Sequence, residues 1–321
     1  LYCQRCPKEQ EKAMNEETRR HERSVRTAIR KSNLSGSFVV GKYRTSPYMA
    51  CQHGCAYCDG RAERYFVEGD FSRDIVVRSN VPVLLSNEMP KLREKGFLTI
   101  ASGITDAYQP LEAELGLTAR CAEVLTQFTT PVTIMTKSSL AVRDVDLWAR
   151  LNEKAGVLFL VSLTFADDKA RSVFEPGASP VAERIEALRR YKEAGCHTGV
   201  LAMPLLPGIS DTEENIDTLF STLLDVGVDF IMPGGLTLRP GRQKDFFLAR
   251  IRQTYPSLTD TYLDLFRENR ESGAPINEYS RRLEAKCWNA NKKHEIPFLV
   301  PHYVYRNRLH IYDEMNVLMH H

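Results

Sequence analysis

Short apolar runs alternate with longer amphipathic stretches along most of this 321-residue chain. The apolar runs are bounded by Gly, Pro or polar residues and predict buried strands over 97–101, 132–136, 157–163, 199–206 and 230–232. Helical spacing of apolar residues predicts helices over 117–127, 142–154, 180–194 and 211–226. Because strands that alternate with helices form parallel sheets, the chain is predicted to have an α/β fold. With a first strand before Cys51 there are six units, and periodicity alone leaves a partial barrel, a full barrel and a doubly wound sheet open.

Three cysteines, Cys51, Cys55 and Cys58, lie within eight positions in the spacing C-x3-C-x2-C, with Gly54 in the wider gap. Disulfides use cysteines in pairs, so three cysteines this close together favour a metal site. Iron–sulfur clusters are held by cysteine thiolates, and three protein ligands would leave one iron of a four-iron cluster open to a small molecule. The alternatives are a zinc site with His53 as fourth ligand and three unrelated core thiols.

The wider motif, SPY-x2-C-x-HGC-x-YC over residues 46–58, resembles the cluster loop of the radical S-adenosylmethionine (SAM) superfamily, in its spore photoproduct lyase-like branch. The resemblance implies a partial (β/α)6 TIM-type barrel over residues 41–240, with an N-terminal arm (1–40) and a C-terminal helical or irregular extension (241–321) that covers the barrel mouth. It also implies a [4Fe-4S] cluster and SAM as cofactors. In this superfamily the cluster reductively cleaves SAM, and a 5′-deoxyadenosyl radical then abstracts hydrogen from a substrate, which is unidentified here.

The resemblance places cofactor contacts at the C-terminal ends of the predicted strands, where parallel βα folds collect functional residues. Tyr57 is expected near the adenine, and Lys137 at the SAM carboxylate. The expected SAM-binding residues are Tyr57, Gly103, Thr105, Asp106, Lys137, Ser162 and Met203, and the expected metal ligands are Cys51, Cys55 and Cys58. Some have simpler explanations: Asp106 as a loop cap, Ser162 bonded to its own backbone, and Met203 as core.

Glu175 and Arg184 also follow the family's spacing, where an ion pair explains them as well as a ligand contact does. No catalytic side chain can be named.

The chain departs from spore photoproduct lyases at two places. In those enzymes the segment after the second strand carries a cysteine that returns a hydrogen atom to the product radical, and residues 101–106 contain none. Asp59 stands where many relatives have an aromatic residue. Thymine-dimer repair is therefore not expected. A nucleic-acid repair or modification enzyme acting on DNA or RNA is the second candidate function, and a metal-binding scaffold without activity is the third.

Both ends of the chain carry basic stretches. Segment 18–31 holds six Arg or Lys residues against Glu22 and is predicted as a basic helix or arm, and residues 281–293 are again basic. Each is either a solvated face or a grip for phosphates. Cys3 and Cys6 form a C-x2-C pair, which is half a metal site or simply two terminal thiols. Residues 298–305 are predicted as a strand or loop near the barrel mouth.

The overall composition is that of an ordinary globular protein, with 43% hydrophobic residues, 26% charged residues and a net charge of +2. This charge is too small to indicate nucleic-acid binding by itself. No apolar run approaches the roughly 20 residues of a membrane helix. A metal-type cysteine cluster indicates a reducing cytoplasm, and the resemblance implies an electron donor such as flavodoxin or ferredoxin.

Overall fold

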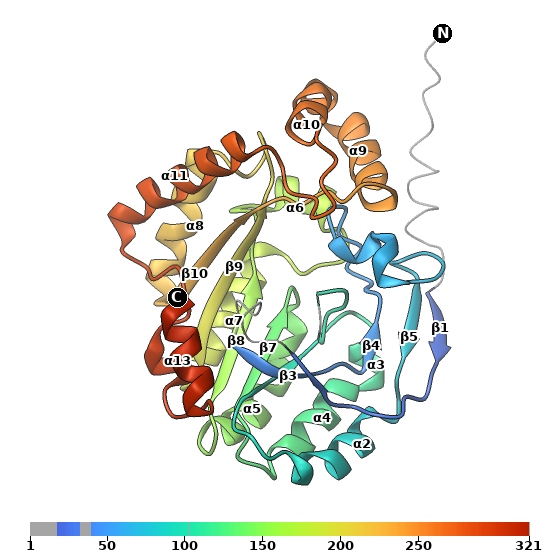
Figure 1. Cartoon of the computed structure of the whole chain (residues 1–321), viewed down its shortest axis with the longest axis vertical. Helices are drawn as coiled ribbons and strands as arrows, with labels where there is room; N and C mark the ends of the chain where they lie inside the picture. Colours follow the sequence, from blue (N-terminus) through green and yellow to red (C-terminus); the bar gives the residue numbers. More distant parts are fainter. Residues whose placement is uncertain (1–17, 33–39, 102, 321) are drawn as a thin grey trace.

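Six parallel strands form the main sheet in the order β3-β6-β7-β8-β9-β10, in a computed structural model that describes residues 18–32, 40–101 and 103–320 (Figure 1). The bounds are β3 (Gly41–Thr45), β6 (Phe97–Ile100), β7 (Val132–Thr136), β8 (Val157–Ser162), β9 (His197–Leu205) and β10 (Phe230–Gly235). The strand order follows the chain in one direction, without the reversal of a doubly wound sheet. Six parallel strands in an open row confirm the predicted partial (β/α)6 barrel. Cys3 and Cys6 lie outside the described residues.

An outer layer of helices covers one face of this sheet. These helices are α2 (Val81–Glu88), α4 (Leu117–Leu125), α5 (Val145–Asn152), α7 (Val181–Glu193) and α8 (Glu213–Val226). The central strand β8 is buried along its whole length, which explains its continuous apolar sequence. On the helix side Phe159 stacks on Tyr191 of α7, with ring centroids 3.6 Å apart. Helix α8 ends at Gly227, whose φ of +71° suits a C-terminal helix cap.

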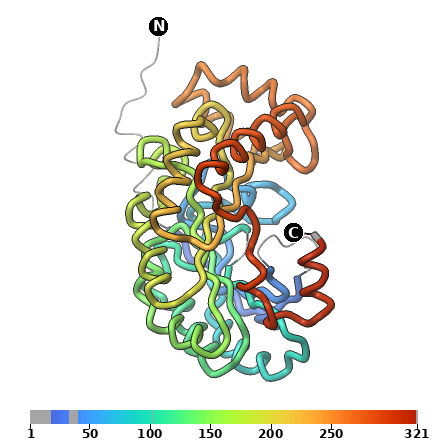
Figure 2. Tube along the Cα trace, turned by 90° about the vertical axis from the view of Figure 1, so that its left-hand side faces the viewer, coloured from blue at the N-terminus to red at the C-terminus, as the bar shows by residue number. Residues whose placement is uncertain are grey.

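The opposite, concave face of the sheet is partly filled by the C-terminus of the chain. Apolar side chains of the strands, Phe97, Leu158, Leu160, Leu201, Phe230 and Met232, pack there against Val300, Val304, Tyr305, Leu309 and Val317. Helices α12 (His302–Tyr305) and α13 (Ile311–His320) carry most of this C-terminal set. In Figure 2 the green and yellow helices lie on one side of the strands and the red C-terminal helix lies on the other. Lys42 of β3 fixes this arrangement through ion pairs with Asp313 and Glu94.

Five further helices lie in the loops or follow the barrel: α3 (Glu112–Leu115), α6 (Asp168–Phe174), α9 (Arg242–Thr254), α10 (Thr259–Leu265) and α11 (Asn277–His294). Helix α9 packs on α6 through Phe247 and Phe174, whose ring centroids are 5.8 Å apart. Tyr262 of α10 donates to the carbonyl oxygen of Pro207, 2.8 Å away. These contacts place α9 and α10 beside the loops that follow the strands (Figure 1).

Two segments differ from the predicted secondary structure. Of the helix or arm expected over segment 18–31, the helix does not form, because its residues pair as short strands: β1 (Arg19–Glu22) with β5 (Asp74–Val77), and β2 (Arg30–Lys31) antiparallel to β3. Strand β4 (Tyr48–Met49) completes the small sheet β1-β5-β4. Residues 302–305, expected as strand or loop, form α12, because packing on the concave face overrides their β propensity. None of the described helices has the length and apolar character needed to cross a membrane.

We predict that filling of the concave face stabilises the whole barrel. Leu309→Ala should lower the free energy of unfolding by about 2–5 kcal/mol, because Leu309 is only 3% exposed within this apolar cluster. The matched change Leu318→Ala, at a side chain that is 47% exposed, should alter it by less than about 0.5 kcal/mol. Urea unfolding of both variants measures the difference, and equal effects would contradict the packing described here.

Candidate functional site

The three cysteines lie on one loop between β4 and the short 3-10 helix Asp59–Arg61. All three are free, Cys51 and Cys55 are buried, and Cys58 is half-buried. Gly54 makes the turn between Cys51 and Cys55 with a φ of +62°, a conformation that favours glycine. This loop follows the C-terminal end of β3 by a few residues, so it lies at the end of the sheet where βα folds place function.

Burial raises the pKa of all three thiols, that of Cys55 to about 12. Neighbouring charge at Cys55 and Cys58 adds to the rise at Cys51, whereas the ammonium of Lys137 acts in the opposite sense on Cys55 and Cys58. Thiols in such a place are inert unless a bound cation stabilises their thiolates. The three thiols therefore fit a metal centre, and binding of the metal would release their protons.

Arg61 supports the cysteine loop from within. Its guanidinium donates to the carbonyl oxygens of Gly54 at 2.9 Å and Cys55 at 3.0 Å. It also lies 3.8 Å from the ring centroid of Phe246 of α9. Burial lowers the pKa of Arg61, and the neighbouring Cys58 and Cys55 oppose that effect. A cation held by carbonyl groups in this way fixes the shape of the loop.

The segment after β6 supports the loop from one side. Gln109 is fully buried and accepts a hydrogen bond from the amide of Gln52 at 3.0 Å. Thr105 donates to the carbonyl oxygen of Ala50 at 2.7 Å. At Gly103 no atom of a described residue other than its chain neighbours lies within 4 Å of the place a Cβ would take, which leaves room for a ligand beside this part of the backbone.

Asp106 ties this segment to the loop and to β7. Its carboxylate accepts from Thr136, from the amide of Lys137 and from the amide of Tyr108, and lies 3.3 Å from Nδ1 of His53. Burial alone would raise the pKa of Asp106, but His53 and these donors lower it to about 2. The carboxylate is thus occupied by protein groups, and His53 faces it.

Glu175 and Arg184 support the loop from the other side as a fully buried ion pair. Glu175 accepts from the hydroxyl of Tyr57 and from Arg184. The remaining donors of Arg184 reach the carbonyl oxygens of Ser162 at 3.0 Å and Ser179 at 2.7 Å. Although burial opposes it, the charges of Arg184 and Lys137 lower the pKa of Glu175. The ion pair between Glu175 and Arg184, one of two explanations open from the sequence, is therefore formed.

Lys137, Ser162 and Met203 lie on the concave side at or just beyond the ends of β7, β8 and β9. Side chains alternate along a strand, and Met135 and Met203 pack against the concave cluster, which puts Lys137 on the same face as Met135. The Lys137 ammonium lies 5.9 Å from the ring centroid of Tyr57 and makes no hydrogen bond or ion pair with a described residue. Burial acts to lower the pKa of Lys137, but the neighbouring Cys55 and Glu175 raise this pKa above its usual value. It is a charged group available to a ligand.

Sequence reasoning missed Arg61, Gln109 and Gln243. Gln243 of α9 donates to the carbonyl oxygen of Tyr57 at 3.0 Å, across 186 positions of the chain. Asp59, which the sequence marks only as a departure from relatives, accepts from Arg239 at 2.7 Å. The position of Arg61, three residues after the last cysteine, could have suggested a side chain that returns to the loop. Nothing in the local sequence signals Gln243 or Arg239.

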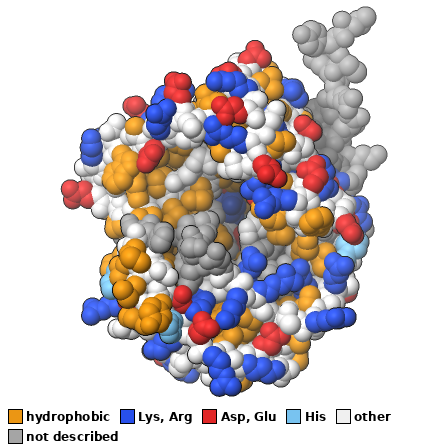
Figure 3. Space-filling view, viewed as in Figure 1, with side chains coloured by type: hydrophobic (Ala, Val, Ile, Leu, Met, Phe, Trp, Pro, Cys, Tyr) orange, Lys and Arg blue, Asp and Glu red, His pale blue; other side chains and the backbone are white. Residues whose placement is uncertain are grey.

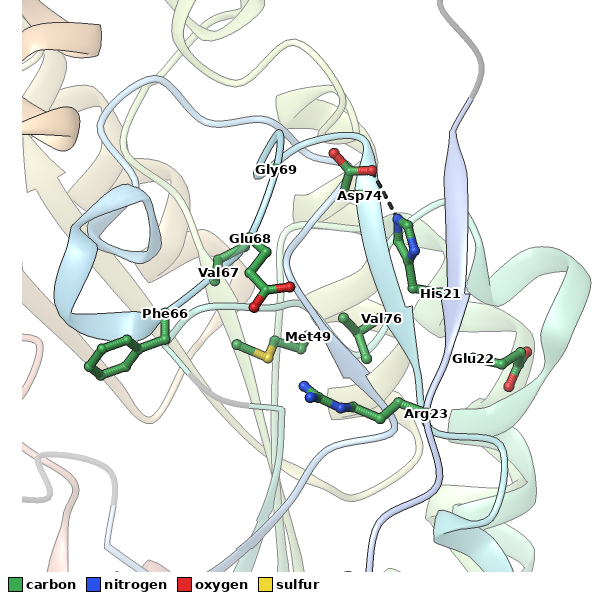
Figure 4. A pocket seen from close by; sticks show the side chains of 10 residues that line it. All are labelled: His21, Glu22, Arg23, Met49, Phe66, Val67, Glu68, Gly69, Asp74 and Val76. Carbon is green, nitrogen blue, oxygen red and sulfur yellow. Dashed lines mark hydrogen bonds and ion pairs between the residues drawn. The ribbon is translucent and has the colours of Figure 1, made fainter.

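A pocket of about 270 Å³ lies elsewhere, on the small sheet (Figure 4). Its lining includes Arg23, Met49, Phe66 and Asp74, and His21 bonds Asp74 at 2.9 Å. None of the expected cofactor residues lines it, so the cysteine loop, and not this pocket, marks the candidate site.

The family model described as the Radical SAM superfamily matches residues 45–220, which span the cysteine loop and most of the barrel. The chain belongs to the radical SAM superfamily. It is therefore an enzyme whose superfamily uses a [4Fe-4S] cluster and SAM, and the residues described above fit both groups. In the described ranges no three His, Cys, Asp or Glu side chains are grouped as a single metal ion requires.

Relatives of this radical SAM enzyme reach across bacteria and archaea. An uncharacterized protein of Mycobacterium tuberculosis is 28% identical over 254 residues, covering 77% of this chain and 73% of the relative. An uncharacterized protein of Methanocaldococcus jannaschii is 27% identical over 173 residues, covering 54% of this chain and 63% of the relative. A spore photoproduct lyase mutant with bound AdoMet and dinucleoside spore photoproduct has a similar fold, with a TM-score of 0.63 at 17% identity over 86% of this chain and 79% of that one.

We predict that the buried ion pair holds the site together. Glu175→Gln should lower the free energy of unfolding by about 3–5 kcal/mol, because it leaves the charge of Arg184 buried and unpaired. The same change at Glu186, which is 56% exposed and 3.8 Å from Arg189, should cost less than about 1 kcal/mol. Chemical denaturation distinguishes them, and a mild effect of Glu175→Gln would mean that Arg184 finds another partner.

Proposed function

We propose that this enzyme cleaves SAM reductively and abstracts a hydrogen atom from a substrate held on the concave face. The single observation that carries the proposal is the loop of three free cysteines, supported on both sides and lying near the ammonium of Lys137, which forms no ion pair with a described residue. When bound, the cluster supplies the electron that cleaves SAM to the 5′-deoxyadenosyl radical.

The residues of this chain would bind and orient the two groups. Cys51, Cys55 and Cys58 would hold the cluster. Lys137 would pair with the SAM carboxylate, since a charged donor with no hydrogen bond or ion pair to a described residue suits a ligand anion. Tyr57 is fixed by its hydrogen bond to Glu175, which would hold its ring against the adenine.

The remaining expected contacts fall into two groups. Gly103, Ser162 and Met203 stay proposed as contacts: Gly103 has open space above its backbone, and the other two lie at strand ends on the concave side. Thr105 and Asp106 are instead proposed as positioning residues, because Ala50, Thr136 and the Lys137 amide already occupy their oxygens. They would act on the cofactors through the loop.

Repair of thymine photoproducts is not the reaction that we propose. Residues 101–106 lack a cysteine. The other described cysteines, Cys121, Cys196 and Cys287, are buried in the main core cluster, and none of them belongs to the cluster on the concave face, where a substrate would lie.

Nucleic acid is the second candidate substrate, and the arginines of segment 18–31 support it only in part. Arg19 and Arg20 are paired with Asp74 and Glu114, and Lys293 in the basic tail is paired with Asp217. Arg23, Arg26 and Arg30 make no such pairs with described residues, so they are the arginines of this segment left for a phosphate.

Superfamily members need an electron donor, and we propose flavodoxin or ferredoxin for this one. A cytoplasmic location is proposed with it, because oxidising surroundings would convert the free thiols of the loop before a cluster could form.

Cluster ligation is tested by replacing each cysteine of the loop. Cys51→Ala, Cys55→Ala and Cys58→Ala should each abolish the visible cluster absorption after anaerobic reconstitution with iron and sulfide, and with it the release of 5′-deoxyadenosine and methionine under dithionite. Cys196→Ala is the matched control and should retain both. A loop variant that keeps a full cluster and cleaves SAM would show that the ligand assignment is wrong.

Lys137→Ala should weaken SAM binding roughly ten- to a hundredfold, the loss expected for one charge-assisted hydrogen bond of about 1.5–3 kcal/mol. Equilibrium binding to the reconstituted protein measures this while the cluster absorption stays at the wild-type level. Lys169→Ala, on the exposed surface of α6, is the control and should leave affinity unchanged. Wild-type affinity in Lys137→Ala would remove this lysine from the SAM site.

A further inference from the structure

Two arginines lie directly opposite each other where the open barrel ends. The register of β2 and β3 pairs Arg30 with Arg44 and Lys31 with Tyr43. Lys31 donates to the carboxylate of Glu94, and the hydroxyl of Tyr43 donates to the carbonyl oxygen of Glu94. Tyr43 packs in the core on the helix side. Arg30 and Arg44 therefore share the other, concave face, and both are exposed there. Like charges directly opposite on neighbouring strands destabilise a sheet, so this pair needs an explanation.

No described carboxylate compensates for the pair. The nearby acids Glu94 and Asp313 are already engaged by Lys42, and Glu94 also by Lys31. Neither Arg30 nor Arg44 forms a side-chain hydrogen bond or ion pair with any residue in the described ranges, unlike Arg19 and Arg20 of the same segment. Residues 33–39, which join the two strands, contain no Asp or Glu.

Arg78 and Arg23 add two further positive charges beside the pair. The amide of Arg23 donates to the carbonyl oxygen of Val77 at 2.8 Å, which places Arg23 next to Arg78. Nε of Arg78 is buried and has no hydrogen-bond partner among the described residues, while its other nitrogens donate to the carbonyl oxygen of Ser46 and to Sδ of Met49. Burial, together with the positive charges of Arg30 and Arg23, lowers the pKa of Arg78. A buried donor left unpaired among like charges indicates a missing anion.

Arg30 and Arg44 lie on the face from which a substrate would approach the cysteine loop. Arg44 lies opposite Thr99 of β6, and Thr99 lies opposite Thr133 of β7. Thr133 is two positions before Met135, which is on the concave face, so this row of side chains lies on that face as well. Lys137 is two positions further along the same strand. Figure 3 shows this face hollowed near its centre, with Lys and Arg side chains along one side of the hollow. Arg44 and Lys137 thus lie on the same face of the sheet, where one substrate would meet both.

We propose that Arg23, Arg30, Arg44 and Arg78, here called the arginine cluster, bind a phosphate group of the substrate. This inference rests on the proposed function, since it assigns the substrate of that site. Guanidinium groups match phosphate oxygens in pairs, and several of them suit a multiply charged anion better than a single carboxylate. The substrate is thus a phosphate ester, either a free phosphorylated molecule or a phosphodiester strand.

The test is equilibrium binding of two probes, inorganic pyrophosphate and a thymidine tetranucleotide, to the full chain by titration calorimetry at low salt. The variants are Arg30→Gln, Arg44→Gln and their combination. The control is Arg150→Gln, the same charge change at an exposed residue of α5 that has no ion pair with a described residue. Wild-type protein and the control should bind at least one probe equally, and each cluster variant should bind roughly tenfold more weakly.

The preferred probe identifies the source of the phosphate: tighter binding of the tetranucleotide assigns a phosphodiester strand, and tighter binding of pyrophosphate assigns a free phosphorylated molecule. Thermal unfolding of the same samples gives an independent readout. Because the like-charge pair is relieved, Arg30→Gln and Arg44→Gln should raise the melting temperature at low salt, whereas loss of a structural contact would lower it.

Absence of binding of both probes to wild type, wild-type affinity in the double variant, or lowered melting temperatures would each overturn the proposal. Release of 5′-deoxyadenosine by the wild-type enzyme is measured separately, so failure of the phosphate site is distinguishable from failure of the proposed function.

Discussion

The buried ion pair between Glu175 and Arg184 is the interaction on which the candidate site depends. Both side chains are out of water, so each charge is tolerated only because the other is present. The pair also reaches outward: Glu175 accepts from Tyr57 in the cysteine loop, and Arg184 donates to the carbonyl oxygen of Ser162 at the end of β8. One interaction therefore fixes the loop to the barrel wall. Arg61, Gln109 and Asp106 also support the cysteine loop. The ion pair sets the position of the loop on which they act.

Sequence periodicity predicted the strands and helices that are stabilised by local or regularly repeated interactions. A strand such as β8, buried on both faces, must be apolar throughout, and helices such as α7 and α8 carry their capping signals beside them. The helix expected as one alternative for segment 18–31 does not form, because the structure of this segment is decided by partners elsewhere: β5 supplies the hydrogen bonds of β1, and Asp74 supplies the charge opposite Arg19. Residues 302–305 form a helix for the same kind of reason, since the concave face they pack on is built from distant strands.

The candidate site shows the same difference between residues that a local sequence pattern predicts and residues whose role depends on distant partners. The cysteines could be predicted because their spacing is a local pattern with a chemical meaning. The positions of Tyr57, Lys137 and Ser162 came with the resemblance, and the structure gathers them around one end of the sheet. Asp106 was expected at a ligand, but its oxygens are taken by backbone and side-chain donors that no single sequence identifies. Gln243 and Arg239 reach the loop across most of the chain, and such partners are set only by tertiary structure.

The ion pair between Lys42 and Asp313 joins residues 271 positions apart in the chain. During synthesis, β3 therefore leaves the ribosome long before the helix that completes its surroundings, and at roughly 5–20 residues per second that interval is many seconds. Over this time the concave face beside β3 stays uncovered, because the apolar side chains between Val300 and Val317 that fill it have not yet been made. The supports of the cysteine loop are also spread along the chain, from Asp106 to Gln243. The order of the chain therefore completes the surroundings of the loop before it completes the packing of the concave face.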